Sequence, residues 1–239
     1  MRTSNMTSGH LAILFLGIFT LACSFANAQN VDSVSLLVDY ETGYGGTVYP
    51  VYNPYVFFKN GTVAKEPKVA IDEMDLKARS KDHAVRWGTW KRSGGKVNIA
   101  WDGVNRRGKQ ETKEADWPGS PAIAAGRNES LNGTWSATGG GGNIAFGGSV
   151  GILSSKRFTF TSDGRFTTED VASTTAPNVA AFSKKNTAGK YKIDGYSIRL
   201  EFNNGESRRL FFCFYGKDKR VIRISGSNFT PASPSKRRR

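Results

Sequence analysis

The chain of 239 residues contains 34 lysines and arginines but 20 acidic residues, which gives a formal net charge of +14. This charge favours partners with anionic surfaces, such as polysaccharide, lipid head groups or an acidic protein. The basic residues are spread rather than interleaved with aromatic residues on one platform, so nucleic acid is not an expected partner. Of the 2 cysteines, Cys23 lies in a segment that we expect to be removed, and the one left cannot form an intrachain disulfide, so a disulfide-stapled secreted scaffold is not expected.

The first 28 residues have the order of features that defines a cleavable secretory signal peptide. Arg2 precedes an apolar stretch from Leu11 to Ala22, and the small residues Ala26–Ala28 follow. A signal peptidase recognises this order, and we expect cleavage between Ala28 and Gln29. The apolar stretch is shorter than the ~20 residues that a membrane-spanning helix needs. The sequence therefore predicts a periplasmic or secreted protein without a transmembrane span after cleavage.

Two alternatives stay open for this segment. It can be retained as a membrane anchor or a buried helix, or Cys23 can become the lipidated end of a lipoprotein, although Thr20 stands where lipoprotein cleavage sites have leucine. Cleavage after Ala28 leaves Cys213 as the single cysteine. Because Cys213 lies in the most apolar run, Leu210–Tyr215, we predict that it is a small buried hydrophobic side chain.

Short segments of alternating apolar and polar residues, separated by glycine, asparagine and aspartate, predict an all-β fold of antiparallel strands. The clearest such segment is Lys190–Phe202, in which Asp194–Gly195 is typical of a two-residue hairpin turn. The apolar residues of this hairpin are expected on one face: Tyr191, Ile193, Tyr196, Ile198, Leu200 and Phe202.

Two segments depart from this pattern. The glycine-rich run Thr138–Gly142 is predicted to be a mobile loop, because consecutive glycines do not hold a regular strand. It lacks the following helix with Lys-Ser/Thr that a phosphate-binding loop requires. The segment Val69–Lys81 has apolar spacing that suggests one short helix.

The most informative feature is an internal repeat. Residues 55–63 match residues 157–166 in pattern, and the strand, turn and strand of 88–103 recur at 189–205. We interpret this as a duplication, with chance convergence of hairpins as the alternative. The expected organisation is a signal peptide, a first β-rich half, a linker, a second β-rich half and a disordered basic tail, at residues 1–28, 31–118, 119–130, 131–230 and 231–239.

The second half is predicted to form a barrel. From Leu131 onward there are about eight strand-length segments, enough to close a small up-and-down barrel. Arg208–Tyr215 is apolar on both faces, so we expect its outer face to pack against the first half. The interior of such a barrel would hold one small apolar ligand or would be filled by side chains.

The sequence Gly133-Thr134-Trp135, followed by a meander of short hairpins, resembles the calycin-type barrels, which include lipocalins and avidins. The resemblance covers residues 131–227 and implies a barrel. The closing arginine and paired cysteines of lipocalins are not recognisable, so the ligands of that family are not implied. The pattern from Phe160 to Gly205 resembles uncharacterised secreted bacterial β-sheet proteins, which imply a fold and no particular activity.

Candidate catalytic, cofactor-binding and metal-binding residues are not found. His83 is the single histidine after signal cleavage, so a Ser-His-Asp triad or a His/Cys zinc site has little to build on. No cofactor is expected. A glycoside hydrolase would need two facing carboxylates, and nothing in the sequence favours one pair among the candidates Asp72, Glu73, Asp75, Glu169 and Asp170.

The aromatic residues fall into two groups. Trp90, Trp101 and Trp135 occupy alternating strand positions and are expected in the core. A loop punctuated by glycine and proline contains the candidates for an exposed patch of the kind that stacks on sugars: Tyr44, Tyr49 and Tyr52.

The function expected from these features is that of an exported, non-catalytic binding or structural module of the cell envelope. Its partner would be an anionic envelope component or a small apolar ligand. The alternatives are a hydrolase that acts on envelope polysaccharide and an adaptor for an acidic protein partner.

Overall fold

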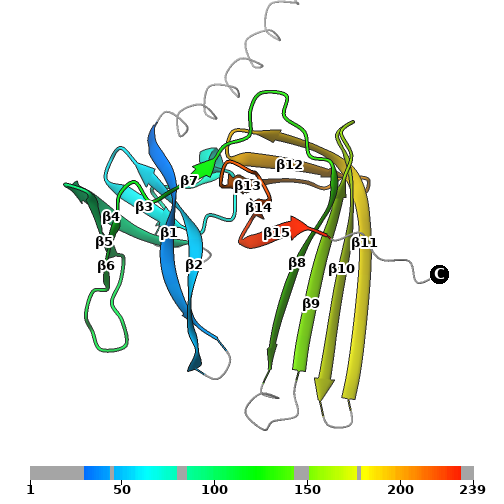
Figure 1. The fold of residues 1–239 in the computed structure, drawn as a ribbon, viewed down its shortest axis with the longest axis horizontal. Helices are drawn as coiled ribbons and strands as arrows, with labels where there is room; N and C mark the ends of the chain where they lie inside the picture. The colour runs from blue at the N-terminus through cyan, green and yellow to red at the C-terminus, as the bar shows by residue number, and fades with distance from the viewer. Residues whose placement is uncertain (1–29, 44–45, 80–84, 143–150, 177–178, 233–239) are drawn as a thin grey trace, which may run out of the picture.

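The computed structural model describes residues 30–43, 46–79, 85–142, 151–176 and 179–232. In these ranges the regular secondary structure is almost entirely β-strand, and neighbouring strands pair antiparallel. The predicted fold class, all-β and antiparallel, is therefore confirmed. The 15 strands belong to one continuous sheet, whose second half closes on itself (Figure 1).

The second half is an eight-stranded up-and-down barrel. Each strand pairs with the next along the chain, and β8 and β15 pair with each other at Ser136↔Thr230, which completes the ring. The barrel predicted from the sequence is thus present. Its strands are β8 (Gly133–Gly142), β9 (Gly151–Phe160), β10 (Arg165–Ala176), β11 (Val179–Asp194), β12 (Ser197–Phe202), β13 (Ser207–Tyr215), β14 (Val221–Ile224) and β15 (Ser227–Pro231).

Aromatic and aliphatic side chains fill the barrel where all eight strands meet. Alternate residues of each strand point inward, as the pleat requires. The largest of these inward side chains are Trp135, Phe158, Phe160, Phe166, Tyr191, Phe212, Phe214 and Phe229. Filling by side chains, one of the two expected outcomes, therefore describes this part of the interior.

The first half is a six-stranded meander with two apolar faces. One face has its own core, built around Tyr55, Phe57 and Trp101. The other face contacts the barrel, where Phe211 and Cys213 of β13 pack with the meander, as expected for a strand that is apolar on both sides. The strands are β1 (Val31–Thr42), β2 (Val48–Phe58), β3 (Thr62–Lys65), β4 (Arg86–Ser93), β5 (Lys96–Trp101) and β6 (Thr112–Asp116).

A short strand joins the two halves edge to edge. The segment 119–130, predicted as a linker, contains β7 (Ser120–Ile123). One edge of β7 pairs with β1 at Ser35↔Pro121, and the other pairs with β13 at Phe214↔Ile123. The meander and the barrel are consequently parts of one sheet.

Three local expectations need correction. The run Thr138–Gly142 is part of β8 and pairs with β9, because the neighbouring strand supplies the hydrogen bonds that glycines alone do not enforce. The expected helix within 69–81 is not an α-helix in the residues described, which have 3-10 conformation at Ile71–Glu73 and at Arg79. The hairpin turn after β11 is shifted by one residue, since Asp194 pairs with Ser197.

The shifted turn moves Tyr196 away from the barrel interior. Its ring stacks on Phe211 on the outer side of the barrel, with ring centroids 6.3 Å apart. Its hydroxyl donates to the carbonyl of Ala122 at 3.0 Å. The other five apolar residues of this hairpin lie in the barrel core or against it, as predicted.

The two segments aligned by the sequence repeat share local geometry. Gly61 and Gly164 both have positive φ, of 80° and 84°. Their carbonyls accept the backbone N–H groups of Trp90 and Tyr191, at 2.8 and 2.7 Å. Gly88 lies opposite Trp101, and Gly189 lies opposite Phe202, at corresponding positions of β4 and β11.

Three parts of the molecule project to the same side, the lower edge of Figure 1. They are the far end of the β1–β2 ribbon, the loop between β5 and β6, and the ends of β8–β11 that extend beyond the closed barrel. In the described ranges, no helix is long and apolar enough to cross a membrane.

Candidate binding groove

A groove of about 760 Å³ separates the β1–β2 ribbon from the open end of the barrel. We call it the central groove. One wall is formed by residues of β1, β2 and the end of β3, and the other by the extended parts of β8–β11 together with β14 and β15. The inward alternation of β9, β10 and β11 continues past the aromatic core into this wall, where the side chains become small and polar.

Hydroxyl and amide groups dominate the uncharged part of the lining. The aliphatic side chains of the lining are those of two valines, Val51 and Val171, and two alanines, Ala137 and Ala172. This composition offers many hydrogen-bond donors and acceptors but little apolar surface. The residues with hydroxyl or amide groups are Asn53, Thr138, Ser154, Ser155, Ser183, Ser227 and Asn228.

Four of the six charged residues that line the groove form two ion pairs, one between the walls and one within the barrel wall. Arg223 lies 2.7 Å from Glu66, and Lys156 lies 3.8 Å from Asp170. The Oδ1 atom of Asp170 is buried and has no hydrogen-bond partner in the described ranges. In the described ranges, neither Glu41 nor Lys185 forms an ion pair. A ligand would therefore meet one open carboxylate and one open ammonium group.

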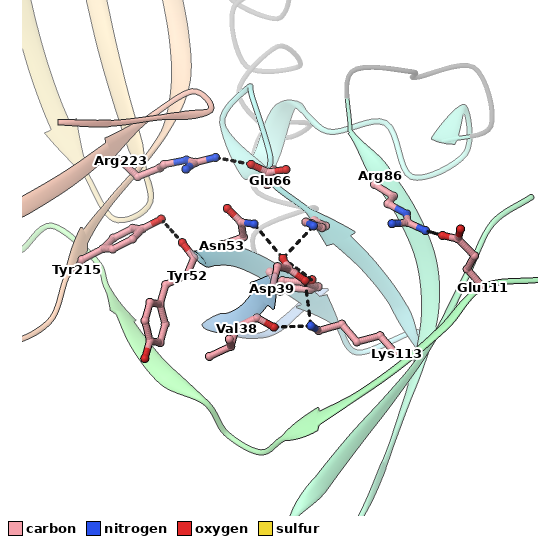
Figure 2. A network of polar contacts seen from close by, with 12 residues as sticks. Val38, Asp39, Tyr52, Asn53, Glu66, Arg86, Glu111, Lys113, Tyr215 and Arg223 are labelled. Atoms are coloured by element: carbon pink, nitrogen blue, oxygen red, sulfur yellow. Dashed lines mark hydrogen bonds and ion pairs between the residues drawn. The ribbon is translucent and has the colours of Figure 1, made fainter. Parts of the chain in front are cut away.

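The Arg223–Glu66 pair fixes the back of the groove. The Arg223 side chain is 4% exposed, and its guanidinium also donates to the Oδ1 atom of Asn228 at 2.9 Å. Nearby, the hydroxyl of Tyr215 donates to the carbonyl of Tyr52 at 2.9 Å (Figure 2). These contacts join β14 and β13 of the barrel to the meander, so the two walls of the groove are held at a set separation.

Behind the groove, a half-buried polar cluster in the meander is centred on Asp39 (Figure 2). Lys65 and Lys113 approach its carboxylate to 2.8 and 2.9 Å. The amide of Asn53, which also lines the groove, and the hydroxyl of Tyr55 donate to the same carboxylate at 2.9 Å. Lys113 also donates to the carbonyl of Val38 and so connects β6 to β1.

The surroundings of Asp39 keep it ionised. Burial by itself raises its pKa, but hydrogen bonds from Lys65, Asn53 and Lys113 outweigh burial and lower the pKa to about 2. The pKa of Tyr55 is raised, first by burial and then by the negative charge of Asp39 and the hydrogen bond to it. Tyr55 therefore stays a neutral donor. Asn53 donates to Asp39 and also lines the groove, so the cluster fixes this part of the groove wall.

The structure places two of the three candidate tyrosines. Tyr49 and Tyr52 are exposed, at 43% and 46%, but they lie in strand β2 rather than in a loop. Tyr49 is close to Glu41 of the groove, with 3.5 Å between its hydroxyl and the carboxylate. Tyr44 lies outside the described residues. Tyr49 therefore lies beside the groove, next to Glu41, whereas Tyr52 lies three residues further along the strand.

The predicted core aromatics and Cys213 are placed as expected. Trp101 and Trp135 are buried, and Trp90 packs against the meander core. Cys213 is fully buried, and burial raises the pKa of its thiol to about 12. The residues proposed for signal cleavage or lipidation, Cys23, Ala28 and Gln29, lie outside the described part, as does His83.

The acidic candidates do not form a facing carboxylate pair. Asp72 and Glu73 bind the same guanidinium, that of Arg209, at 2.8 and 3.1 Å. Asp75 accepts the backbone N–H groups of two following residues. The Glu169 and Asp170 side chains are neighbours on β10, and each has its own basic partners. Among the residues that the structure describes, no three His, Cys, Asp or Glu side chains gather as a metal site would require.

Comparisons with protein-family models, with curated proteins and with solved structures find no match to this chain. The resemblance to calycin-type barrels expected from the sequence is therefore not confirmed by any of these comparisons.

Proposed function

We propose that the chain is an exported binding module that holds a hydroxyl-rich ligand, such as a short stretch of glycan, in the central groove. The observation that carries this proposal is the composition of the groove, in which hydroxyl, amide and charged groups converge on a space of about 760 Å³. That volume lies within the range of small-molecule sites in proteins. The filled aromatic core leaves the polar end of the barrel as the place for a ligand.

Glycan chemistry matches the groups available. A sugar hydroxyl both donates and accepts, so it can pair with the amide and hydroxyl groups that line the groove. The Tyr49 ring beside Glu41 supplies a surface on which a sugar ring can stack. Glu41 and Lys185 favour a ligand that also has charged or amino substituents.

Binding of soluble oligosaccharides tests this proposal. Maltohexaose and chitohexaose would be titrated into the exported protein by isothermal titration calorimetry, and native mass spectrometry would detect any sugar that co-purifies. Ser183→Trp puts an indole into the groove from β11 and should abolish binding. Ser207→Trp, the same change at an exposed site on β13, should leave it intact. Equal binding by both variants, or no bound or co-purified sugar with the unaltered protein, would contradict the proposal.

The same titration distinguishes a hydrolase. Three carboxylates, Glu41, Glu66 and Asp170, line the groove, which is the observation that favours this second candidate. A hydrolase would release new reducing ends from the oligosaccharide over time, and a binding module would return it intact. Loss of reducing-end release in Glu41→Gln would assign the activity to the groove.

Export is the second part of the proposal, and the sequence of residues 1–28 supports it. The intact mass of the protein recovered from the cell exterior or periplasm should correspond to a chain that begins at Gln29. A mass that corresponds to a lipidated chain beginning at Cys23 would replace this proposal with a lipid-anchored protein.

We also infer that the two halves arose by duplication of a four-strand unit, β2–β5 in the meander and β9–β12 in the barrel. The matched turns at Gly61 and Gly164 and the matched strand positions of Gly88 and Gly189 support this inference. In the second copy the unit became part of a closed, calycin-like ring, and in the first it stayed open.

A further inference from the structure

The large apolar side chains that are exposed gather on one side of the molecule. In the described ranges each lies in the β5–β6 loop or within five residues of a strand end on the side that projects downward in Figure 1. Tyr40, Val104 and Phe182 are exposed by 73%, 68% and 70%. The other members are Val48, Tyr49, Tyr52, Ile152 and Leu153. We call these eight residues the distal apolar set.

The set comes from three separate projections rather than from one continuous face. Four members lie on the β1–β2 ribbon, one in the β5–β6 loop and three on β9 and β11. The projections are spread along the longest dimension of the molecule, with the central groove between two of them (Figure 1). A broad, flat partner can touch all three at once, whereas a small globular partner would reach only one or two.

Basic residues accompany two of the three projections. Arg106, Arg107 and Lys109 follow Val104 in the β5–β6 loop and are exposed. On β11, the exposed residues Lys184 and Lys185 follow Phe182. Aromatic and aliphatic side chains next to lysine and arginine are the combination that enters the head-group region of an anionic bilayer.

We propose that the distal apolar set and its neighbouring cations form a docking surface for an anionic phospholipid membrane, which the protein binds peripherally. The apolar side chains insert to the level of the head groups, and the cations contact lipid phosphates. The surface adjoins the central groove, which Lys185 also lines and Tyr49 borders. In the docked orientation the groove opens close to the membrane plane.

Co-sedimentation with lipid vesicles tests the surface. The mature protein should sediment with vesicles of phosphatidylglycerol and phosphatidylcholine in equal amounts, and much less with phosphatidylcholine alone. The double variant Leu153→Ser/Phe182→Ser should lower the partition coefficient about tenfold or more, because two inserted side chains are lost. Arg106→Gln/Arg107→Gln should lower it about fivefold per residue, an effect that high salt removes.

The matched control removes two charges at the opposite end of β11. Lys190→Gln/Lys192→Gln changes the net charge by the same amount at exposed positions away from the projections, and it should leave vesicle binding nearly unchanged. An equal loss in this control would show unspecific attraction and overturn the proposal, as would failure of the unaltered protein to sediment. If the unaltered protein is a dimer that Leu153→Ser/Phe182→Ser dissociates, the surface is a protein interface and the membrane proposal is wrong. Circular dichroism of each variant confirms that it is folded.

Discussion

Arg223 and Glu66, from different halves of the molecule, form an ion pair of 2.7 Å in which the two side chains are buried to different extents. The Arg223 side chain is 4% exposed, whereas that of Glu66 is 34% exposed. Loss of either partner leaves the other without its counter-charge, but only the arginine lacks access to water. Removal of Glu66 should therefore lower stability more than removal of Arg223.

We expect Glu66→Ala to lower the free energy of unfolding by about 3 kcal/mol, because it leaves a buried guanidinium unpaired. Arg223→Met should cost only about 1 kcal/mol, since water can solvate the freed Glu66 carboxylate and the methionine fills the space. Urea denaturation of both variants measures the difference. Glu206→Ala, which removes the partner of the exposed Arg208, serves as a control with little effect. Equal losses for Glu66→Ala and Arg223→Met would contradict this account.

Acid should weaken the fold through Asp39. The pKa of this carboxyl in the folded protein is about 2, below the ordinary value of 3.8, so its charged form stabilises the fold above about pH 4. That contribution, ~2 kcal/mol, is lost as the pH falls from about 4 toward 2. Asp39→Asn lacks this group, so the gap in unfolding free energy between the natural protein and the variant should narrow over this interval. A difference in unfolding free energy that stays constant with pH would contradict this role of Asp39.

A side chain at either of two glycines, which occupy matching positions in β4 and β11, should destabilise the fold. A Cβ atom at Gly88 would stand 2.6 Å from the carbonyl oxygen of Ala100, and one at Gly189 would stand 2.0 Å from that of Glu201. Both contacts are with backbone, so Gly88→Ala and Gly189→Ala should each cost about 1–3 kcal/mol. Gly95 has open space around the same atom, and Gly95→Ala should be nearly neutral. Thermal melts of the three variants would show the contrast, and a similar melting temperature for all three would refute it.

The thiol of Cys213 should be inert in the folded protein. It is fully buried, and its pKa of about 12 leaves almost no thiolate at neutral pH. Ellman's reagent at about pH 8 should therefore react with the protein only after denaturant is added. Fast reaction under native conditions would mean that β13 separates from the meander readily.

The sequence alone was sufficient for the barrel because the period of two along a strand is a local property. The apolar alternation of β11 and β12 and the two-sided apolar character of β13 follow directly from pleat geometry. Turn glycines with positive φ, such as Gly164 and Gly205, were equally visible. The loop predicted for the glycine run of β8 was wrong, because the strand conformation of this run comes from pairing with β9 and not from its own residues.

The groove could not be predicted for the opposite reason. Glu66 and Arg223 are 157 residues apart in sequence, and Asn53 and Ser183 meet across the same space without any shared motif. The Asp39 cluster likewise combines single polar residues from four strands, each of which resembles an ordinary surface residue in the sequence. The groove residues are brought together by the contact between the closed ring and the meander, and the Asp39 cluster by strand pairing within the meander.

The double pairing of β7 has a consequence for how the chain can be divided. A polypeptide that stops before residue 119, or one that starts after residue 123, would leave backbone groups of β1 or β13 open to any other strand. Such fragments should aggregate. Two intact copies that opened at this point could instead trade halves and form a domain-swapped dimer. The four residues of β7 therefore hold the two halves of the chain in one sheet.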